Sequence, residues 1–383
     1  MKDFGSILKN APFDGRLIFN GADGYADLIE SVTEIHADRG EAVTARKIAD
    51  ASKRRGDVIV FEYDGKNLSS GDEISLCGDA LAHFCGEDAR KFRLKVQKNG
   101  HALYALVVGE SLKEFVIDET TVIGRFGVRR KNLERFDKVI VDLTLPSSLK
   151  SGAFAEAFCE CASVVAESLD KRLSAIAENS SVSTEYTDEI VSLISGEKSG
   201  DIFSAIVKAQ ILYVRYLYEN ACAKPSALNA VTEVLKKRTG ASGGECAFAA
   251  AKALVALYKR VVESEGVMNN LLVPLYNERL SSLTALFKAD ADAFLKNFEP
   301  YSEKQVYSRL SALCGNAAAK EYCDRAEETM KKLERAYARV YGGRKKRATF
   351  SQDDIVFALR EGGYFCNGLL KYLSDGGITE ALD

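Results

Sequence analysis

The feature that most constrains this chain is a change of sequence pattern near residue 145. Before it, short apolar runs alternate with helical patterns, and after it helical periodicity continues through most of the 383 residues. The join begins with a nearly continuous apolar run, Lys138–Leu143, which is typical of a parallel strand covered on both faces. A polar turn follows at Pro146–Ser151, and an Ala-rich helix is predicted to begin near Gly152.

This pattern predicts an α/β N-terminal domain, residues 1–145, built on a truncated, mostly parallel sheet, and an all-helical C-terminal domain, residues 146–383. In such folds the ligand cleft lies at the carboxyl ends of the strands, between the halves. Glu156 and Glu160 are four residues apart in the first long helix, so they share one helix face. We therefore predict that both side chains line an inter-domain cleft that binds a small molecule.

Composition excludes several classes of partner. Apolar residues make up 46% and charged residues 28%, as in ordinary globular proteins. The formal net charge of −3 disfavours nucleic acid, because neutralising phosphates requires a basic face. No apolar run approaches 18 residues and the N-terminus has no signal-peptide core, so no membrane segment is expected. Nine cysteines without a CxxC pair indicate reduced thiols and a cytoplasmic protein.

The first part of the chain yields specific expectations for its elements. Apolar runs predict strands at Arg16–Phe19, Asp57–Glu62, Phe92–Gln97 and Leu103–Val108. Amphipathic spacing predicts helices at Ala26–Ala37, Thr44–Arg54 and Ile74–Glu87. His36 and His83 then lie on helices, where we interpret them as hydrogen-bonded or exposed side chains and not as metal ligands.

One strand–turn–helix pattern is a candidate cofactor site. The strand Leu103–Val108 ends at Gly109, and a helical pattern starts at Ser111. Such a turn can place a phosphate on a helix N-terminus. Gly109 and Ser111 are therefore the candidate cofactor-binding residues, with NAD(P) as the candidate cofactor.

Four sequence blocks from residue 137 onward resemble one known family. They are KVIVDL with LPSSLKSGAFAEAF, ASGGECAFAAAKAL (Ala241–Leu254), ESEGV (Glu263–Val267) and ALREGGYFCNGLLKYLSDGGI (Ala358–Ile378). In order and spacing they resemble sn-glycerol-1-phosphate dehydrogenase, of the superfamily that includes iron-containing alcohol dehydrogenases, glycerol dehydrogenases and dehydroquinate synthases. The resemblance implies a dehydroquinate synthase-like fold and an NAD(P)-linked oxidoreductase acting on a small polyol or phosphorylated polyol.

The residues that carry the family's chemistry are not kept. The family's metal site takes one aspartate and two histidines, and those positions hold Glu156, Ala250 and Glu265, with Cys246 one turn before Ala250. No histidine follows His101. The family's lysine after the aspartate corresponds to Glu160, its two closing arginines correspond to Cys366 and Gly368, and its threonine-rich loop has no room between Ser111 and Lys138.

Two interpretations of these substitutions remain. Glu156, Cys246 and Glu265 could ligate zinc through carboxylates and a thiolate, or they could be structural residues at a lost site. We expect them to lie near Ala250 and one another and to hold no divalent metal, because one thiol and two carboxylates suit zinc poorly. The favoured prediction is a pseudoenzyme, a non-catalytic or repurposed binding protein that could form a homo-oligomer. The alternative is an active NAD(P)-linked oxidoreductase.

Overall fold

The computed structural model describes most of the chain, in two compact units. The described residues are 13, 15–20, 30–39, 42–52, 58–70, 72–84, 86–108, 111–124, 127–142, 147–183, 185–195, 202–219, 226–264, 303–341, 348–366, 368–373 and 378. Unit 1 comprises Met1–Thr120, Arg130–Phe158 and Gly196–Ala221, and unit 2 comprises Thr121–Arg129, Cys159–Ser195 and Cys222–Asp383. The predicted division into residues 1–145 and 146–383 stays a prediction about independently folding domains.

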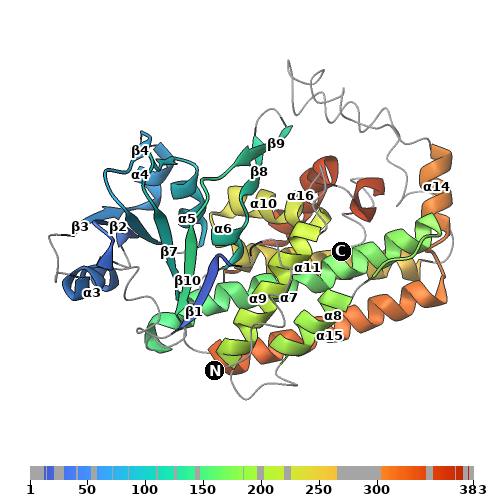
Figure 1. Cartoon of the computed structure of the whole chain (residues 1–383). Helices are drawn as coiled ribbons and strands as arrows, with labels where there is room; N and C mark the ends of the chain where they lie inside the picture. Colours follow the sequence, from blue (N-terminus) through green and yellow to red (C-terminus); the bar gives the residue numbers. More distant parts are fainter. Residues whose placement is uncertain are drawn as a thin grey trace. The chain divides into compact units, whose positions relative to one another are not determined.

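Unit 1 is organised around a six-stranded parallel sheet (Figure 1). Its spatial order is β1 (Leu17–Asn20), β10 (Lys138–Asp142), β7 (Leu103–Val107), β5 (Ala80–His83), β2 (Glu34–Asp38) and β3 (Ile59–Tyr63). Every pairing in this sheet is parallel. The α/β prediction for the N-terminal part is therefore confirmed.

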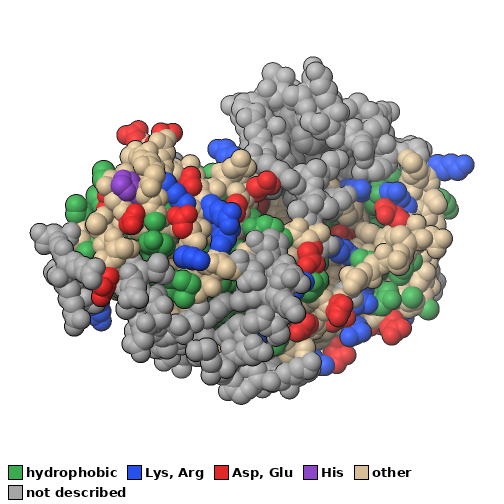
Figure 2. Space-filling model, viewed as in Figure 1, with side chains coloured by type: hydrophobic (Ala, Val, Ile, Leu, Met, Phe, Trp, Pro, Cys, Tyr) green, Lys and Arg blue, Asp and Glu red, His purple; other side chains and the backbone are tan. Residues whose placement is uncertain are grey.

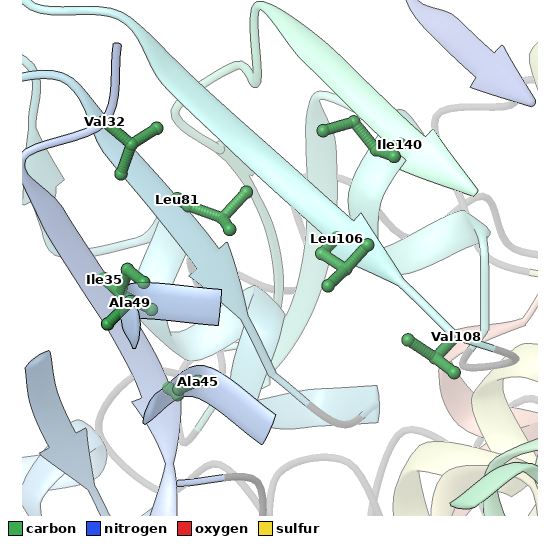
Figure 3. Packing of buried hydrophobic residues seen from close by; sticks show 9 residues of the cluster. Val32, Ile35, Ala45, Ala49, Leu81, Leu106, Val108 and Ile140 are labelled. Carbon is green, nitrogen blue, oxygen red and sulfur yellow. The ribbon is translucent and has the colours of Figure 1, made fainter. Parts of the chain in front are cut away.

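The sheet core explains why the central strands lack the alternation of a half-buried strand. Leu81 on β5, Leu106 on β7 and Ile140 on β10 pack in one cluster with Ala45 and Ala49 of α3 (Ala42–Ser52) (Figure 3). All four residues of β5 are buried. Each large aliphatic side chain buried in this way stabilises the fold by about 1.5–3 kcal/mol.

Several predicted elements of this unit are wrong in type. The predicted helix Ala26–Ala37 is wrong over its last residues, because Glu34–Asp38 forms β2. The predicted helix Ile74–Glu87 is replaced by β4 (Ile74–Ser75), β5 and the start of α5 (Gly86–Arg93). The predicted strand Phe92–Gln97 is wrong at its start, since α5 runs to Arg93 and only Val96–Gln97 forms β6. The strands expected around β1, β3, β7 and β10 and the helix at α3 are confirmed.

The remaining elements of unit 1 are short, apart from one helix contributed by a later part of the chain. They are α4 (Gly65–Ser70), α6 (Lys113–Val116) and α9 (Ile202–Glu219), together with the two-stranded sheet of β4 and β6. A second two-stranded sheet joins β8 (Glu119–Gly124) and β9 (Gly127–Asn132). α9 contacts α6 and thereby packs with the α/β unit.

From residue 147 onward the described residues form helices and contain no strand, which confirms the helical C-terminal prediction. The long helix α7 (Ser147–Glu178) begins five residues before the predicted start at Gly152. The helices after α7, other than α9, are α8 (Glu185–Ile194), α10 (Ala227–Thr239), α11 (Gly243–Glu263), α14 (Glu303–Ser311), α15 (Ala317–Tyr341), α16 (Gln352–Phe365) and the 3₁₀ turn η4 (Leu369–Tyr372).

Local sequence fixes the ends and contacts of the unit 2 helices. Ser226 and Ser242 cap α10 and α11 through their hydroxyls, which accept hydrogen bonds from backbone N–H groups of the first turn. α10 and α16 approach closely at Gly362, where a Cβ would lie 3.0 Å from the backbone nitrogen of Val231. Only glycine permits this crossing without displacing a helix.

The described surface carries both signs of charge. On the face shown in Figure 2, acidic and basic side chains are interspersed over the described elements. Among the helices described, none combines the length and the apolar character that crossing a membrane requires. None of the seven cysteines that the structure describes forms a disulfide bond.

Candidate functional site

Glu156, which the sequence resemblance predicts to replace a metal-binding aspartate, lies beside the N-terminus of α5. A Cβ atom on Gly86, the first residue of α5, would lie 3.3 and 3.4 Å from the two carboxylate oxygens of Glu156. Gly86 has a φ of +44°, a conformation that favours glycine. α5 follows the carboxyl end of β5, the position where parallel-sheet folds bind anionic ligands on helix N–H groups. In this chain the carboxylate of Glu156 lies beside that helix start.

A side chain of the protein also binds the start of α6, the helix that follows the neighbouring strand β7. The backbone N–H of Leu112, just before α6, donates a hydrogen bond of 2.5 Å to Oε1 of Gln210. Gln210 is buried on α9. Ser111, the predicted cofactor residue, is buried, and its carbonyl accepts a hydrogen bond from the N–H of Glu114. Gly109, the other predicted cofactor residue, lies outside the described residues.

These two positions belong to neighbouring strands, because β5 pairs directly with β7. A dinucleotide phosphate at α5 would have to displace the Glu156 carboxylate, and it would also meet Glu87 and Asp88 in the first turn of that helix. Glu87 is paired with Arg90 and Asp88 with Lys91, so the charge that opposes a phosphate at this helix start is mainly that of Glu156. The described residues at the start of α5 therefore do not fit a dinucleotide phosphate as they stand.

Glu160 lies one turn beyond Glu156 in α7 and belongs to unit 2. Its side chain is buried, and its backbone carbonyl accepts a hydrogen bond of 2.6 Å from the hydroxyl of Ser163. The predicted role of Glu160 in an inter-domain cleft stays a prediction.

Cys246 is an interior residue of α11. Burial raises the pKa of its thiol to about 11, and a hydrogen bond with Thr239, at the end of α10, offsets this rise only in part. The thiol is therefore protonated near neutral pH, whereas zinc binds the thiolate. Ala250, one turn further along α11, is buried and has no ligating atom in its side chain.

The predicted gathering of Glu156, Cys246, Ala250 and Glu265 stays a prediction, because Glu265 lies outside the described residues. Within the described part of the chain, no three His, Cys, Asp or Glu side chains form a group that could hold a metal ion. Of the three positions that the structure describes, Ala250 has no ligating atom, so Glu156 and Cys246 alone fall short of the three or four protein ligands that zinc prefers.

The two buried histidines of unit 1 are strand residues, which corrects their predicted placement on helices. His36 lies on β2, with Nε2 at 3.2 Å from Oε2 of Glu34 and Nδ1 at 2.9 Å from the hydroxyl of Tyr63. His83 lies on β5, with Nδ1 at 3.2 Å from the carbonyl oxygen of Leu106. Both side chains are buried and hydrogen-bonded within unit 1.

Comparison with known proteins identifies the fold and nothing finer. No protein-family model and no curated protein sequence matches the chain. A candidate alcohol dehydrogenase from Ralstonia eutropha JMP134 is similar in structure, with 12% identity, coverage of 96% of this chain and 94% of that chain, and a TM-score of 0.52. An iron-containing alcohol dehydrogenase from Corynebacterium glutamicum has 10% identity, coverage of 96% and 93% and a TM-score of 0.46. An aldehyde reductase from Escherichia coli has 11% identity, coverage of 96% and 98% and a TM-score of 0.48.

With a parallel α/β unit followed by helices, the chain has the fold of the iron-containing alcohol dehydrogenases and dehydroquinate synthases. The resemblance to glycerol-1-phosphate dehydrogenase is a narrower statement, and it belongs to the proposal that follows.

Proposed function

We propose that this protein is a non-catalytic, glycerol-1-phosphate dehydrogenase-like binding protein whose nicotinamide and metal sites have degenerated. The observation that carries the proposal is the Glu156 carboxylate against Gly86, at the start of a helix that follows a parallel strand, a position that can receive a phosphate. The carboxylate supplies the negative charge that a bound cofactor would otherwise bring.

Hydride transfer requires a nicotinamide held against the substrate and, in metal-dependent dehydrogenases, a Lewis acid on the substrate oxygen. Glu156 lies against the first residue of α5, and Gln210 accepts a hydrogen bond from the N–H just before α6, so oxygen atoms of the protein already lie at the starts of these two helices. The protonated Cys246 and the side chain of Ala250 offer no metal ligand. Neither requirement of the chemistry is met by these residues, which supports a binding role.

The ligand class follows from the same resemblance. We propose a small polyol or phosphorylated polyol, bound at the carboxyl ends of the strands where this fold class forms its sites. A homo-oligomer is part of the same proposal.

Calorimetric titration with NADH and NADPH tests the loss of the nucleotide site. The wild-type protein is expected to show no binding up to about 1 mM, which corresponds to less than about 4 kcal/mol of binding free energy. Glu156→Ala removes the internal carboxylate and is expected to tighten dinucleotide binding at least about tenfold, or about 1.4 kcal/mol. Glu178→Ala, which removes an exposed carboxylate at the far end of the same helix, is the matched control and should behave as wild type.

The alternative is an active NAD(P)-linked oxidoreductase. Low-micromolar dinucleotide binding by the wild type, or reduction of NAD(P) in the presence of glycerol 1-phosphate, would establish it and overturn the proposal. Titration with glycerol 1-phosphate alone tests the ligand class separately, because a binding protein retains that affinity without any cofactor.

A further inference from the structure

A second buried carboxyl, Asp170 on α7, lies outside the site described above. Its Oδ1 accepts a hydrogen bond of 2.9 Å from the backbone N–H of Leu369. The preceding residue, Gly368, crosses directly over Oδ2, so that a Cβ atom at this position would overlap the carboxyl. Gly368 also has a φ of +127°, which L side chains rarely adopt. The N–H of Leu369 and the missing Cβ of Gly368 therefore both allow this segment to pack against the carboxyl of Asp170.

The groups that face this carboxyl come from α7, α11 and the C-terminal segment. Lys171 and Lys371 favour its ionised form, and the hydroxyl of Tyr258 on α11 does so as well. Burial outweighs them and raises the pKa of Asp170 to about 6, from an ordinary value of 3.8. The same burial, together with Asp170 and Cys366, raises the pKa of Tyr258 well above its ordinary value, so the phenol stays neutral at and below neutral pH.

We propose that Asp170 is a proton-operated latch that holds the segment Gly368–Leu373 against α7. When the segment is packed, it keeps water from the carboxyl. When the segment lifts, the carboxyl is hydrated and its proton affinity falls towards that of an ordinary aspartic acid. The packed arrangement therefore binds a proton more tightly than the lifted one, and acid favours packing.

The direction and range of this effect follow from linkage. The folded pKa is raised, so the stabilising contribution is fully present below about pH 4 and is lost as the pH rises through about 6. Between pH 4.5 and 7.5 the ratio of packed to lifted segment should fall about 30-fold. The ionised carboxylate still accepts the Leu369 N–H at neutral pH, so the segment is loosened and not released.

Hydrogen exchange of the full-length protein, followed by mass spectrometry and corrected for intrinsic exchange rates, measures the latch directly. We expect protection of the peptide containing Leu369 to fall about 30-fold from pH 4.5 to 7.5 in the wild type. Asp170→Asn, which keeps an acceptor oxygen but cannot ionise, should remain protected at both pH values. Asp188→Asn is the control. It removes an exposed acid of α8 that pairs with Arg172, a residue of the same helix as Asp170, and it should keep the wild-type pH dependence.

Two results would overturn the proposal. One is pH-independent protection of the Leu369 peptide in the wild type, measured against peptides of α15 as the internal reference. This comparison needs no variant, so it holds even if Asp170→Asn does not fold. The other is a pH dependence in Asp170→Asn equal to that of the wild type. Gly368→Ala gives a further check, because its Cβ would force the segment off the carboxyl and should abolish protection at both pH values.

Discussion

Arg93 donates a hydrogen bond of 2.8 Å from Nη2 to Oδ1 of Asp118, and its guanidinium is completely buried in unit 1. The same group donates to the backbone carbonyls of Glu134, Glu114 and Ile117 at 2.7–2.8 Å. Burial lowers the pKa of Arg93 to about 10, with Asp118 opposing the change, so the side chain remains charged at neutral pH. One cation therefore ties together the connections that follow α6 and precede β10.

We expect Arg93→Met to destabilise unit 1 by about 3–5 kcal/mol, because it leaves three carbonyls without their donor and leaves Asp118 with Arg16 as its remaining arginine partner. Urea unfolding followed by circular dichroism measures the change. Arg46→Met is the matched control: its partner Glu62 is 2.5 Å away at the surface, and loss of such a pair costs less than about 1 kcal/mol. Equal losses in both variants would show that Arg93 does not organise these loops.

The sequence predicted the strands with long apolar runs, and it failed where burial removed the periodicity. β5 is four residues long and buried on both faces, so its sequence lacks the alternation of apolar and polar residues that marks a half-buried strand. Together with the residues around it, its apolar residues have a spacing that also suits a helix. Between β4 and β5 lies Gly78, where a Cβ would overlap the hydroxyl of Thr33. That contact joins residues 45 positions apart, and no local pattern contains it.

The candidate site shows the same limit. Glu156 was identified from its spacing and from the family blocks, but its neighbour Gly86 is 70 residues earlier in the chain. Gln210 was missed, although a single amide in the apolar run of α9 was a detectable sign of a buried hydrogen bond. Gly368 was noted as a lost arginine position. The structure gives the physical reason for glycine there, since any side chain would overlap Asp170.

His36 gives a pH-dependent prediction for unit 1. Burial lowers its pKa from 6.5, and the hydrogen bond and charge of Glu34 oppose the change in part. A histidine with a lowered folded pKa contributes stability above its unfolded pKa of about 6.5 and loses it as the pH falls through the folded value. We expect the free energy of unfolding to fall on acidification below pH 6.5, because the unfolded chain then binds a proton at this histidine more tightly than the folded chain does. His36→Gln should flatten that part of the profile, whereas His101→Gln should leave it unchanged. A steeper fall in His36→Gln than in wild type would contradict the assignment.

The last prediction concerns the thiol of Cys246, one turn before Ala250 on α11. Cys246 is buried on α11 and the pKa of its thiol is raised to about 11, so at pH 7.5 well under one part in a thousand is thiolate. Alkylation requires the thiolate and access to it, and Cys77, which is exposed, has that access. Iodoacetamide at pH 7.5, followed by peptide mass spectrometry, should modify Cys77 at least about 100-fold faster than Cys246. Added zinc should not change the rate at Cys246, because the metal would first have to remove a tightly held proton from a buried group. If Cys246 were modified rapidly and zinc suppressed that modification, Cys246 would be an accessible thiolate ligand. The proposal that the metal site is lost would then be wrong.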